Sequence, residues 1–149
     1  MKQICIIPFL LIFFNCLYAQ SVEDSVKATI NQLFTAMKQG DSAMLSDTFA
    51  DSAVLQTIGN RAGKTFIRNE SVRAFASQIK TLPKGAADER ITFETIKIDG
   101  PLALVWTPYQ FYFQEKFSHC GVNSFHLVRL DGKWKIQFLI DTRRKEPCK

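Results

Sequence analysis

The side chains best suited to chemistry lie near the C-terminal end of this sequence. His119 and Asp141 form a candidate acid–base pair, because burial can move the pKa of an imidazole or a carboxyl group toward neutrality, where proton transfer is efficient. Arg143 and Arg144 are candidate contacts for an anionic group, and a solvated basic tail is the alternative. These residue types predict acid–base chemistry or the binding of a small polar ligand.

The segment WTPYQFYF, residues 106–113, is dense in aromatic side chains. Trp106 and Tyr109 are the candidates for the wall of a pocket that holds a flat ligand. Pro108 has no N–H for a strand ladder and predicts a bulge or break that changes which side chains face inward. The alternative is that these aromatic residues only pack in the core or at a dimer interface.

The histidines and cysteines do not favour a metal site or a nucleophile. His119 and His126 lie seven residues apart, which places them on opposite faces of an unbroken strand. His119 and Cys120 are neighbours and also face opposite sides, so they do not predict a Cys–His nucleophile. The sequence has no glycine-rich phosphate loop, serine elbow or paired-cysteine motif. We therefore expect no metal and no cofactor.

The 149 residues have the composition of one ordinary globular domain. Hydrophobic residues make up 46% and charged residues 22%, which excludes disordered, collagenous and coiled-coil classes. Lysine and arginine total 19 against 14 acidic residues, but the basic residues are scattered rather than gathered into a stripe. We therefore expect no nucleic-acid partner.

Residues 1–19 predict a secretory signal peptide. Lys2 gives a positive start, the apolar run that follows is too short to span a bilayer, and Ala19 suits a cleavage point. An uncleaved membrane anchor is the alternative. Cleavage would leave one domain, residues 20–149, that is secreted or periplasmic and free of the membrane.

The four cysteines divide between these two parts of the chain. Cys5 and Cys16 fall in the predicted signal peptide, whereas Cys120 and Cys148 stay with the domain. In an oxidising compartment two cysteines predict one disulfide, which would fasten the C-terminal tail to a strand. Two free thiols are the alternative, because pairing also requires the two Cα atoms to lie close together.

Hydrophobic periodicity predicts helices in the first half of the chain and mostly strands in the second. Gly40 ends the first helix, and Asp41 and Asn69 can cap the second and third. The predicted helices cover residues 22–39, 42–49 and a segment from Asn69 to Pro83. The predicted strands cover residues 53–58, 64–67, 91–98, 102–113, 122–130 and 133–142, with a turn over 59–63. This order is typical of an α+β fold.

A two-residue turn at Asp131 and Gly132 sets a register for the last two strands. Without a bulge, that register places Asn123 and Phe125 on the concave face and His126 on the convex face. The pairs that it predicts are Phe125 with Phe138, Asn123 with Ile140, and His126 with Gln137.

The same register decides which residues can contact a ligand. His119 shares the parity of Asn123, so both are candidate ligand contacts that point inward. Asp141 and Arg143 face inward only if a bulge intervenes, and they would then cluster with His119 at the mouth of a pocket.

Three stretches of sequence carry a resemblance to a known superfamily. AMKQGDSAMLSDTFADSAVL and DGKWKI resemble the NTF2-like superfamily, and FSHCGVNSFHLVRLDGKWKIQFLIDTRR resembles its bacterial subgroup labelled putative lumazine-binding proteins. The resemblance implies a SnoaL-like α+β cone, in which a strongly curved, mostly antiparallel sheet wraps around three helices from the N-terminal half. It also implies a homodimer through the convex face of the sheet.

Three functions fit these observations. The leading hypothesis is a protein that binds a small planar organic ligand in an aromatic-lined cone. A cofactor-free lyase or isomerase, of dehydratase or ketosteroid-isomerase type, would use His119 and Asp141 as its acid–base pair. A dimerisation module would have its cone filled by side chains such as Phe34, Phe75, Phe93 and Phe138. No residue-by-residue match to the superfamily's enzyme motifs occurs, which favours binding over catalysis.

Overall fold

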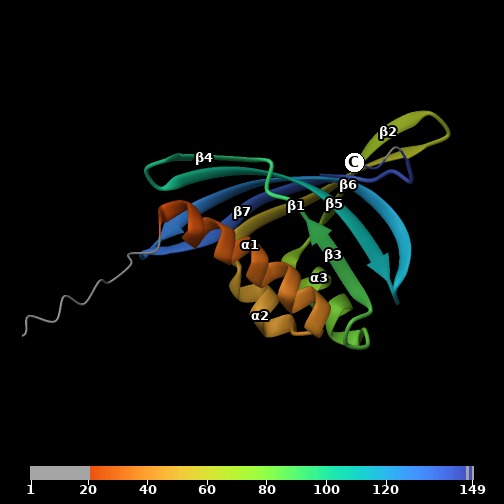
Figure 1. Ribbon diagram of the computed structural model, residues 1–149, viewed down its shortest axis with the longest axis horizontal. Coiled ribbons are helices and arrows are strands. Elements are labelled where there is room, and N and C mark those ends of the chain that lie inside the picture. Colours follow the sequence, from red (N-terminus) through yellow and green to blue (C-terminus); the bar gives the residue numbers. More distant parts are fainter. Residues whose placement is uncertain (1–20, 147, 149) are drawn as a thin grey trace, which may run out of the picture.

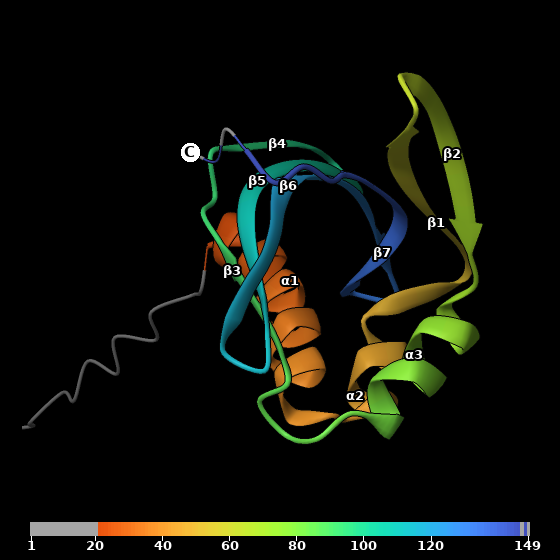
Figure 2. The same ribbon diagram turned by 90° about the vertical axis from the view of Figure 1, so that its right-hand side faces the viewer.

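A strongly curved sheet wraps around three helices in the computed structural model, which describes residues 21–146 and 148 (Figure 1). The strands follow the order β2-β1-β7-β6-β5-β3, and β4 pairs with β5 beside β3. Every pairing is antiparallel except that of β1 with β7. Figure 2 shows the sheet curling, with β5 and β6 on one side of the interior and β1 and β2 on the other. The predicted α+β cone is confirmed.

The helices and strands have the following bounds. The helices are α1 Val22–Gln39, α2 Ser42–Asp47 and α3 Val72–Thr81. The strands are β1 Phe49–Arg61, β2 Lys64–Glu70, β3 Ala87–Ile91, β4 Thr95–Asp99, β5 Leu102–Phe113, β6 Lys116–Leu130 and β7 Lys133–Thr142.

The first helix begins and ends as the sequence predicts, whereas α2 begins as predicted but ends at Asp47, because Phe49 already belongs to β1. Val26 and Ile30 on the apolar stripe of α1 are fully buried against the sheet. Gly40 ends α1 in the left-handed conformation, with φ of 73°, which glycine adopts without steric cost. The Asp41 carboxylate then accepts hydrogen bonds from two backbone N–H groups of α2. Across the described residues, no helix is both long and apolar enough to cross a membrane.

The third helix begins later than predicted, with Ser71 as its N-cap in place of Asn69. The Ser71 hydroxyl accepts from the Ala74 N–H, whereas Asn69 stays in β2 and accepts from the Gln56 side chain. The hairpin before α3 is also longer than predicted. Its strands β1 and β2 pair as far as Arg61 with Lys64, so the predicted turn over residues 59–63 is reduced to Ala62 and Gly63.

The predicted strand over residues 91–98 is wrong, because two separate strands, β3 and β4, lie along β5 at this edge. Pro108 of β5 still accepts a hydrogen bond from the Thr92 N–H, but it has no N–H of its own to give back. The break therefore falls in the neighbouring strand at residues 92–94, while β5 runs unbroken over its predicted length.

A bulge changes the register between β6 and β7. The pairs from Leu130 with Lys133 to Leu127 with Ile136 follow the prediction, and the register then shifts by one residue. The pairs predicted beyond that point are wrong. The observed pairs there are His126 with Phe138, Phe125 with Leu139, Ser124 with Ile140, and Asn123 with Asp141.

The shifted register reverses which side chains in the last part of β7 face the concave side of the sheet. Phe138 lies on the convex face, where its ring contacts that of His126 edge-on at 5.8 Å between centroids. Leu139 packs against the buried core, and Asp141 faces the interior with only 8% of its surface exposed.

Candidate functional site

A cavity of about 360 Å³ lies between the helices and the concave face of the sheet. Its apolar surface comes mainly from α1, α3 and the middle of the sheet. The apolar residues that line it are Leu33, Phe34, Met37, Leu55, Phe75, Ile79, Leu82, Ala87, Phe111, Phe113 and Leu139. A wider hollow of about 670 Å³ lies among α2, the start of β1 and α3, but its charged side chains, Asp51, Arg73 and Lys80, are exposed. Only the smaller of these two is lined by buried or half-buried titratable groups, so we take it as the candidate site.

One row of polar residues crosses the concave face beside the cavity. Its members are register partners on five neighbouring strands: Arg68, Thr57, Asp141, Asn123 and Thr107. The adjacent row on the same face is apolar: Leu55, Leu139, Phe125 and Val105. A run of polar side chains in an otherwise apolar interior needs hydrogen-bond partners, which the following contacts supply.

Asp141 is the centre of these contacts and has both carboxylate oxygens occupied. Oδ1 accepts from the Thr57 hydroxyl at 2.6 Å, and Oδ2 accepts from Arg143 Nε at 2.8 Å and from the Tyr109 hydroxyl at 3.2 Å. With both oxygens engaged, this carboxylate fixes the orientation of the groups that donate to it. Asp141 therefore positions Arg143 and Tyr109.

Arg143 and Tyr109 keep fixed protonation states around this carboxylate. Burial by itself lowers the pKa of Arg143, but the Asp141 carboxylate outweighs burial and raises that pKa overall, so the guanidinium stays charged. Burial, with a further contribution from Asp141, raises the pKa of Tyr109 well above its usual range. The Tyr109 hydroxyl thus remains a donor, and it also lies 2.9 Å from the carbonyl oxygen of Thr142.

Glu89 is the titratable group that sequence reasoning missed. It lies on β3 and lines the cavity, where its Oε1 accepts a hydrogen bond of 2.8 Å from Asn123 Nδ2. Burial raises the pKa of Glu89 to about 7, and the Asp141 charge adds to the rise, while Asn123 and Arg143 oppose it. A carboxyl group with this pKa exchanges protons at neutral pH. The alternation of Ala87, Glu89 and Ile91 was the available sequence signal, but the predicted strand began only at Ile91.

His119 lies across β5 from Glu89, since both are register partners of Phe111. Its ring packs against Phe111 at 5.0 Å and edge-on against Tyr109 at 5.7 Å between centroids. Burial, followed by the charge of Arg143, lowers the pKa of His119, so the imidazole is neutral at neutral pH. Its Nδ1 lies 3.0 Å from the Ser118 hydroxyl.

The structure brings four of the sequence-predicted residues to the cavity wall: His119, Asn123, Asp141 and Arg143. Tyr109 lies behind them and is bonded to Asp141. Trp106 does not line the cavity, so its prediction as part of an aromatic wall is corrected. It is 41% exposed on the convex face, because β5 keeps its alternation through Pro108, and Phe111 is the aromatic residue of β5 that faces the cavity in its place.

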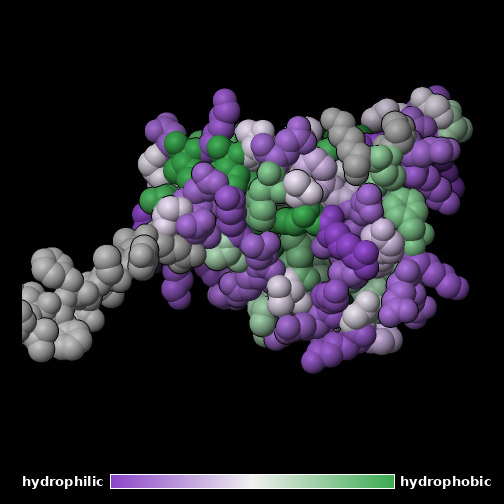
Figure 3. All heavy atoms as spheres, in the orientation of Figure 1, coloured by the Kyte–Doolittle hydropathy of each residue, from purple (hydrophilic) through white to green (hydrophobic). Residues whose placement is uncertain are grey.

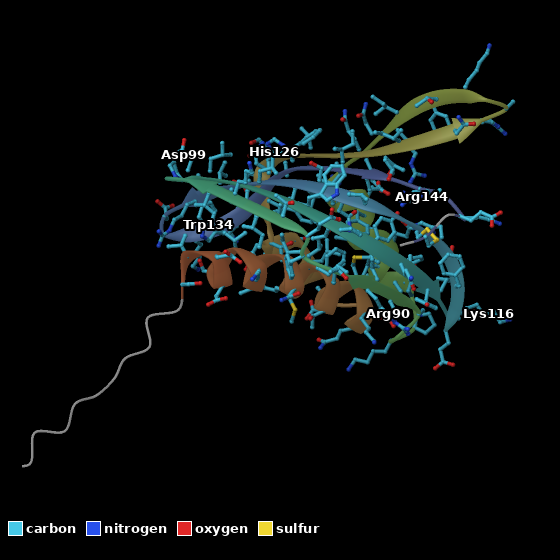
Figure 4. The ribbon with its side chains drawn as sticks, turned by 45° about the horizontal axis from the view of Figure 1, so that its top comes forward. Arg90, Asp99, Lys116, His126, Trp134 and Arg144 are labelled. Atoms are coloured by element: carbon cyan, nitrogen blue, oxygen red, sulfur yellow. A yellow bond between two sulfur atoms is a disulfide. The ribbon has the colours of Figure 1, made fainter. Side chains whose placement is uncertain are left out.

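A disulfide joins Cys120 of β6 to Cys148, with 5.9 Å between the Cα atoms (Figure 4). Arg144 forms a pair of backbone hydrogen bonds with Cys120, so the chain after β7 runs beside β6. The approach is closest at Gly121, where a Cβ atom would lie 1.8 Å from the Thr142 carbonyl oxygen. Cys5, Cys16 and the predicted signal peptide, residues 1–19, lie outside the described residues. Within the described part of the chain, no three side chains of metal-ligating type lie close enough to hold a metal ion.

A curved sheet wrapped around three helices, with a cavity between the layers, defines an NTF2-like protein. The chain belongs to the family described as "Putative lumazine-binding", whose model matches residues 21–137. No curated protein matches the chain.

Solved structures show the same fold at low sequence identity. An NTF2-like protein of unknown function from Shewanella baltica is 14% identical, with 83% of this chain and 94% of that chain covered and a TM-score of 0.65. A protein of unknown function with a cystatin-like fold from Nostoc punctiforme is 11% identical, with 83% and 93% covered and a TM-score of 0.65. An NTF2-like protein of unknown function from Methylobacillus flagellatus is 20% identical, with 83% and 94% covered and a TM-score of 0.61.

Proposed function

We propose that this protein binds a small, flat organic molecule in the cavity between α1, α3 and the sheet. The observation that carries the proposal is a cavity of about 360 Å³ with an apolar floor and a polar wall that still has hydrogen-bonding capacity. Three side-chain atoms on this wall have no hydrogen-bond partner among the described residues. They are Glu89 Oε2, Asn123 Oδ1 and His119 Nε2, and all three residues line the cavity. Pockets for small molecules typically combine these properties.

The same cavity argues against a dimerisation module with a filled cone. Phe34 and Phe75 line the space without closing it, and Phe138, which such a module would turn inward, lies on the convex face. The description of the family, putative lumazine-binding, names a flat two-ring molecule and supports a ligand of this shape.

Native mass spectrometry of the purified protein, before and after gentle denaturation, tests the binding proposal. We expect a small adduct that denaturation releases, or fluorescence quenching when lumazine is added as the probe. Leu139→Trp, which fills the cavity, should remove binding, whereas Trp106→Leu on the convex face should leave it unchanged. Absence of any adduct, of lumazine binding and of binding by unrelated flat dyes would contradict the proposal.

We also propose that the protein is exported and dimerises through the convex face of its sheet. The disulfide supports export, because such bonds persist in oxidising compartments. Large apolar side chains are exposed on the sheet, among them Val54, Leu102 and Trp106, and Figure 3 shows apolar residues gathered over the end of the molecule where β4 lies. The mass of the secreted protein shows whether the predicted signal peptide has been cleaved. Light scattering tests the dimer, because Trp106→Glu should convert it to a monomer. A wild-type monomer would contradict the dimer.

A cofactor-free lyase or isomerase is the second candidate function, and Glu89 is the observation that favours it. Its pKa of about 7 and its unpartnered Oε2 suit a group that transfers a proton, whereas both oxygens of Asp141 are occupied. Deuterium exchange into enolisable ketones and hydroxy acids, followed by NMR, tests this function. Glu89→Gln should abolish exchange, whereas the exposed Glu94→Gln should leave it unchanged. No exchange by the wild-type protein would remove the candidate.

A further inference from the structure

The unpartnered polar atoms around the cavity are not distributed evenly. At the inner end, Asn123 uses its Nδ2 to donate to Glu89, which leaves its carbonyl oxygen free as a pure acceptor beside Glu89 Oε2. Among the described residues neither atom has a partner. The side-chain oxygen of Asn123 is always an acceptor, and Glu89 Oε2 is an acceptor when Glu89 is ionised, so a ligand that satisfies this end brings a hydrogen-bond donor such as a hydroxyl or an N–H group.

Toward β1 and β2 the cavity wall offers donors. Arg143 uses Nε for Asp141 and one Nη2 proton for Thr57, at 3.2 Å, and its other N–H groups have no partner in the described part of the chain. Arg68 is the register partner of Thr57 and also lines the cavity, with no partner of its own among the described residues. Two arginines thus line the cavity on the side of Thr57, one from β2 and one from the segment after β7. A guanidinium presents a planar set of N–H donors that matches the two oxygens of a carboxylate.

The acidic side chains near the two arginines do not remove their preference for a carboxylate. Glu70 also lines the cavity, and a carboxylate can accept hydrogen bonds from guanidinium N–H groups. No ion pair joins Glu70 to Arg68 or Arg143 in the described residues. Asp141 is already saturated by its three donors.

The distance between the two ends suits a two-ring molecule. Three strand spacings separate the backbones of Arg68 and Asn123, which is about 14 Å for strands about 4.8 Å apart, and both side chains reach into this space. The surface between them is apolar, with Leu55, Leu139 and Phe111 available to pack against a flat ring system.

From this arrangement we infer that the ligand is a flat organic acid, bound with its carboxylate at Arg68 and Arg143 and a hydroxyl or N–H donor at Asn123 and Glu89. The inference rests on the proposed binding function and adds the class and the orientation of the ligand. It also gives the ligand a direction, with the acid beside the exposed Arg68 and the donor beside the buried Asn123.

Four related naphthalene probes test the inference by isothermal titration. The first is a hydroxynaphthoic acid with its two groups at opposite ends of the rings, the second its methyl ester, the third its methoxy analogue, and the fourth naphthol. We expect the hydroxy acid to bind best, with about a tenfold loss for the ester and for the methoxy compound, since each lacks one charge-assisted or buried hydrogen bond.

Matched variants identify which residues bind each end of the ligand. Arg68→Gln should weaken the acid about tenfold and leave the ester unchanged, because Arg68 is exposed and has no partner whose loss would disturb the fold. Asn123→Leu should remove the preference for the hydroxyl over the methoxy group and keep the preference for the acid. Lys97→Gln, an exposed charge on β4, is the control and should change neither.

The outcomes separate the two claims. If naphthol and the ester bind as well as the acid, and the cavity-filling Leu139→Trp abolishes their binding, the acid inference is wrong and the binding function stands. If none of the four probes binds and lumazine also fails, both are wrong. A preference for the acid that survives Arg68→Gln and Arg143→Gln together would also overturn the inference.

Discussion

The protonation of Glu89 makes the stability of this protein depend on pH in a way that one substitution isolates. The folded-state pKa of about 7 lies above the ordinary value of 4.5, chiefly because of burial. A group whose pKa is raised by folding contributes stability that is complete below its unfolded pKa and is lost as the pH rises through its folded pKa. Glu89→Gln replaces the carboxyl with a neutral group of the same size that can still accept from Asn123.

The magnitude follows from the two pKa values. Moving the pKa from 4.5 to about 7 corresponds to about 3 kcal/mol, since each unit is worth about 1.4 kcal/mol. The wild-type protein should therefore lose about 3 kcal/mol relative to Glu89→Gln between about pH 4 and about pH 9, mostly between 4.5 and 7. For a domain of this size that corresponds to about 10 °C in melting temperature.

Urea denaturation of both proteins across this pH range measures the effect. The difference in unfolding free energy between them cancels the titration of every group that the substitution leaves alone. Glu94→Gln serves as the control, because it removes an exposed carboxyl group between β3 and β4 by the same substitution. A difference for Glu89→Gln that does not change with pH would refute the assignment of Glu89 as a buried, proton-exchanging carboxyl group.

Three further substitutions test the packing around the site. Thr107→Val should leave the unfolding free energy unchanged or raise it by up to about 1 kcal/mol, because the buried Thr107 hydroxyl has no partner among the described residues; a loss above 1 kcal/mol in urea titration would contradict this. Gly121→Ala should destabilise the protein by more than about 2 kcal/mol, because its Cβ would overlap the Thr142 carbonyl group, and a wild-type melting curve would show that the tail can move aside. Cys148→Ser should cost about 3 kcal/mol, as expected for a cross-link that spans 28 residues; an equal melting temperature for the variant and the oxidised wild type would contradict it.

Much of the fold was predictable because the decisive signals are local. The apolar repeat of α1, the cap at Asp41 and the turn at Asp131 and Gly132 each depend on a few neighbouring residues, and the structure has them as predicted. The limits of β5 and β7 also follow from the sequence. Local signals of this kind do not require knowledge of the tertiary contacts.

The site was less predictable because it depends on single-residue shifts. One extra residue in β7, near Gln137, reverses the facing of Asp141, and no glycine or proline in that segment marks the bulge. Pro108 did predict an irregularity in β5, but the break lies in the neighbouring strand. The alternation of β5 is therefore kept, and Trp106 faces outward. Glu89 was missed because its burial comes from partners distant in sequence, Phe111 and Asn123.

The parallel pairing of β1 with β7 determines when the cavity can form during folding. Thr57 and Asp141, which meet in that pairing, lie 84 residues apart, so their contact closes a very long loop. Contacts of this separation slow folding, because the entropy of loop closure is lost before the contact stabilises the chain. Within residues 21–146, the hairpin of β1 and β2 joins the rest of the sheet through the pairing of β1 with β7 alone. The cavity of a nascent chain therefore cannot form until almost all of the chain has emerged, and loss of the segment that contains β7 would remove one strand and the cavity wall with it.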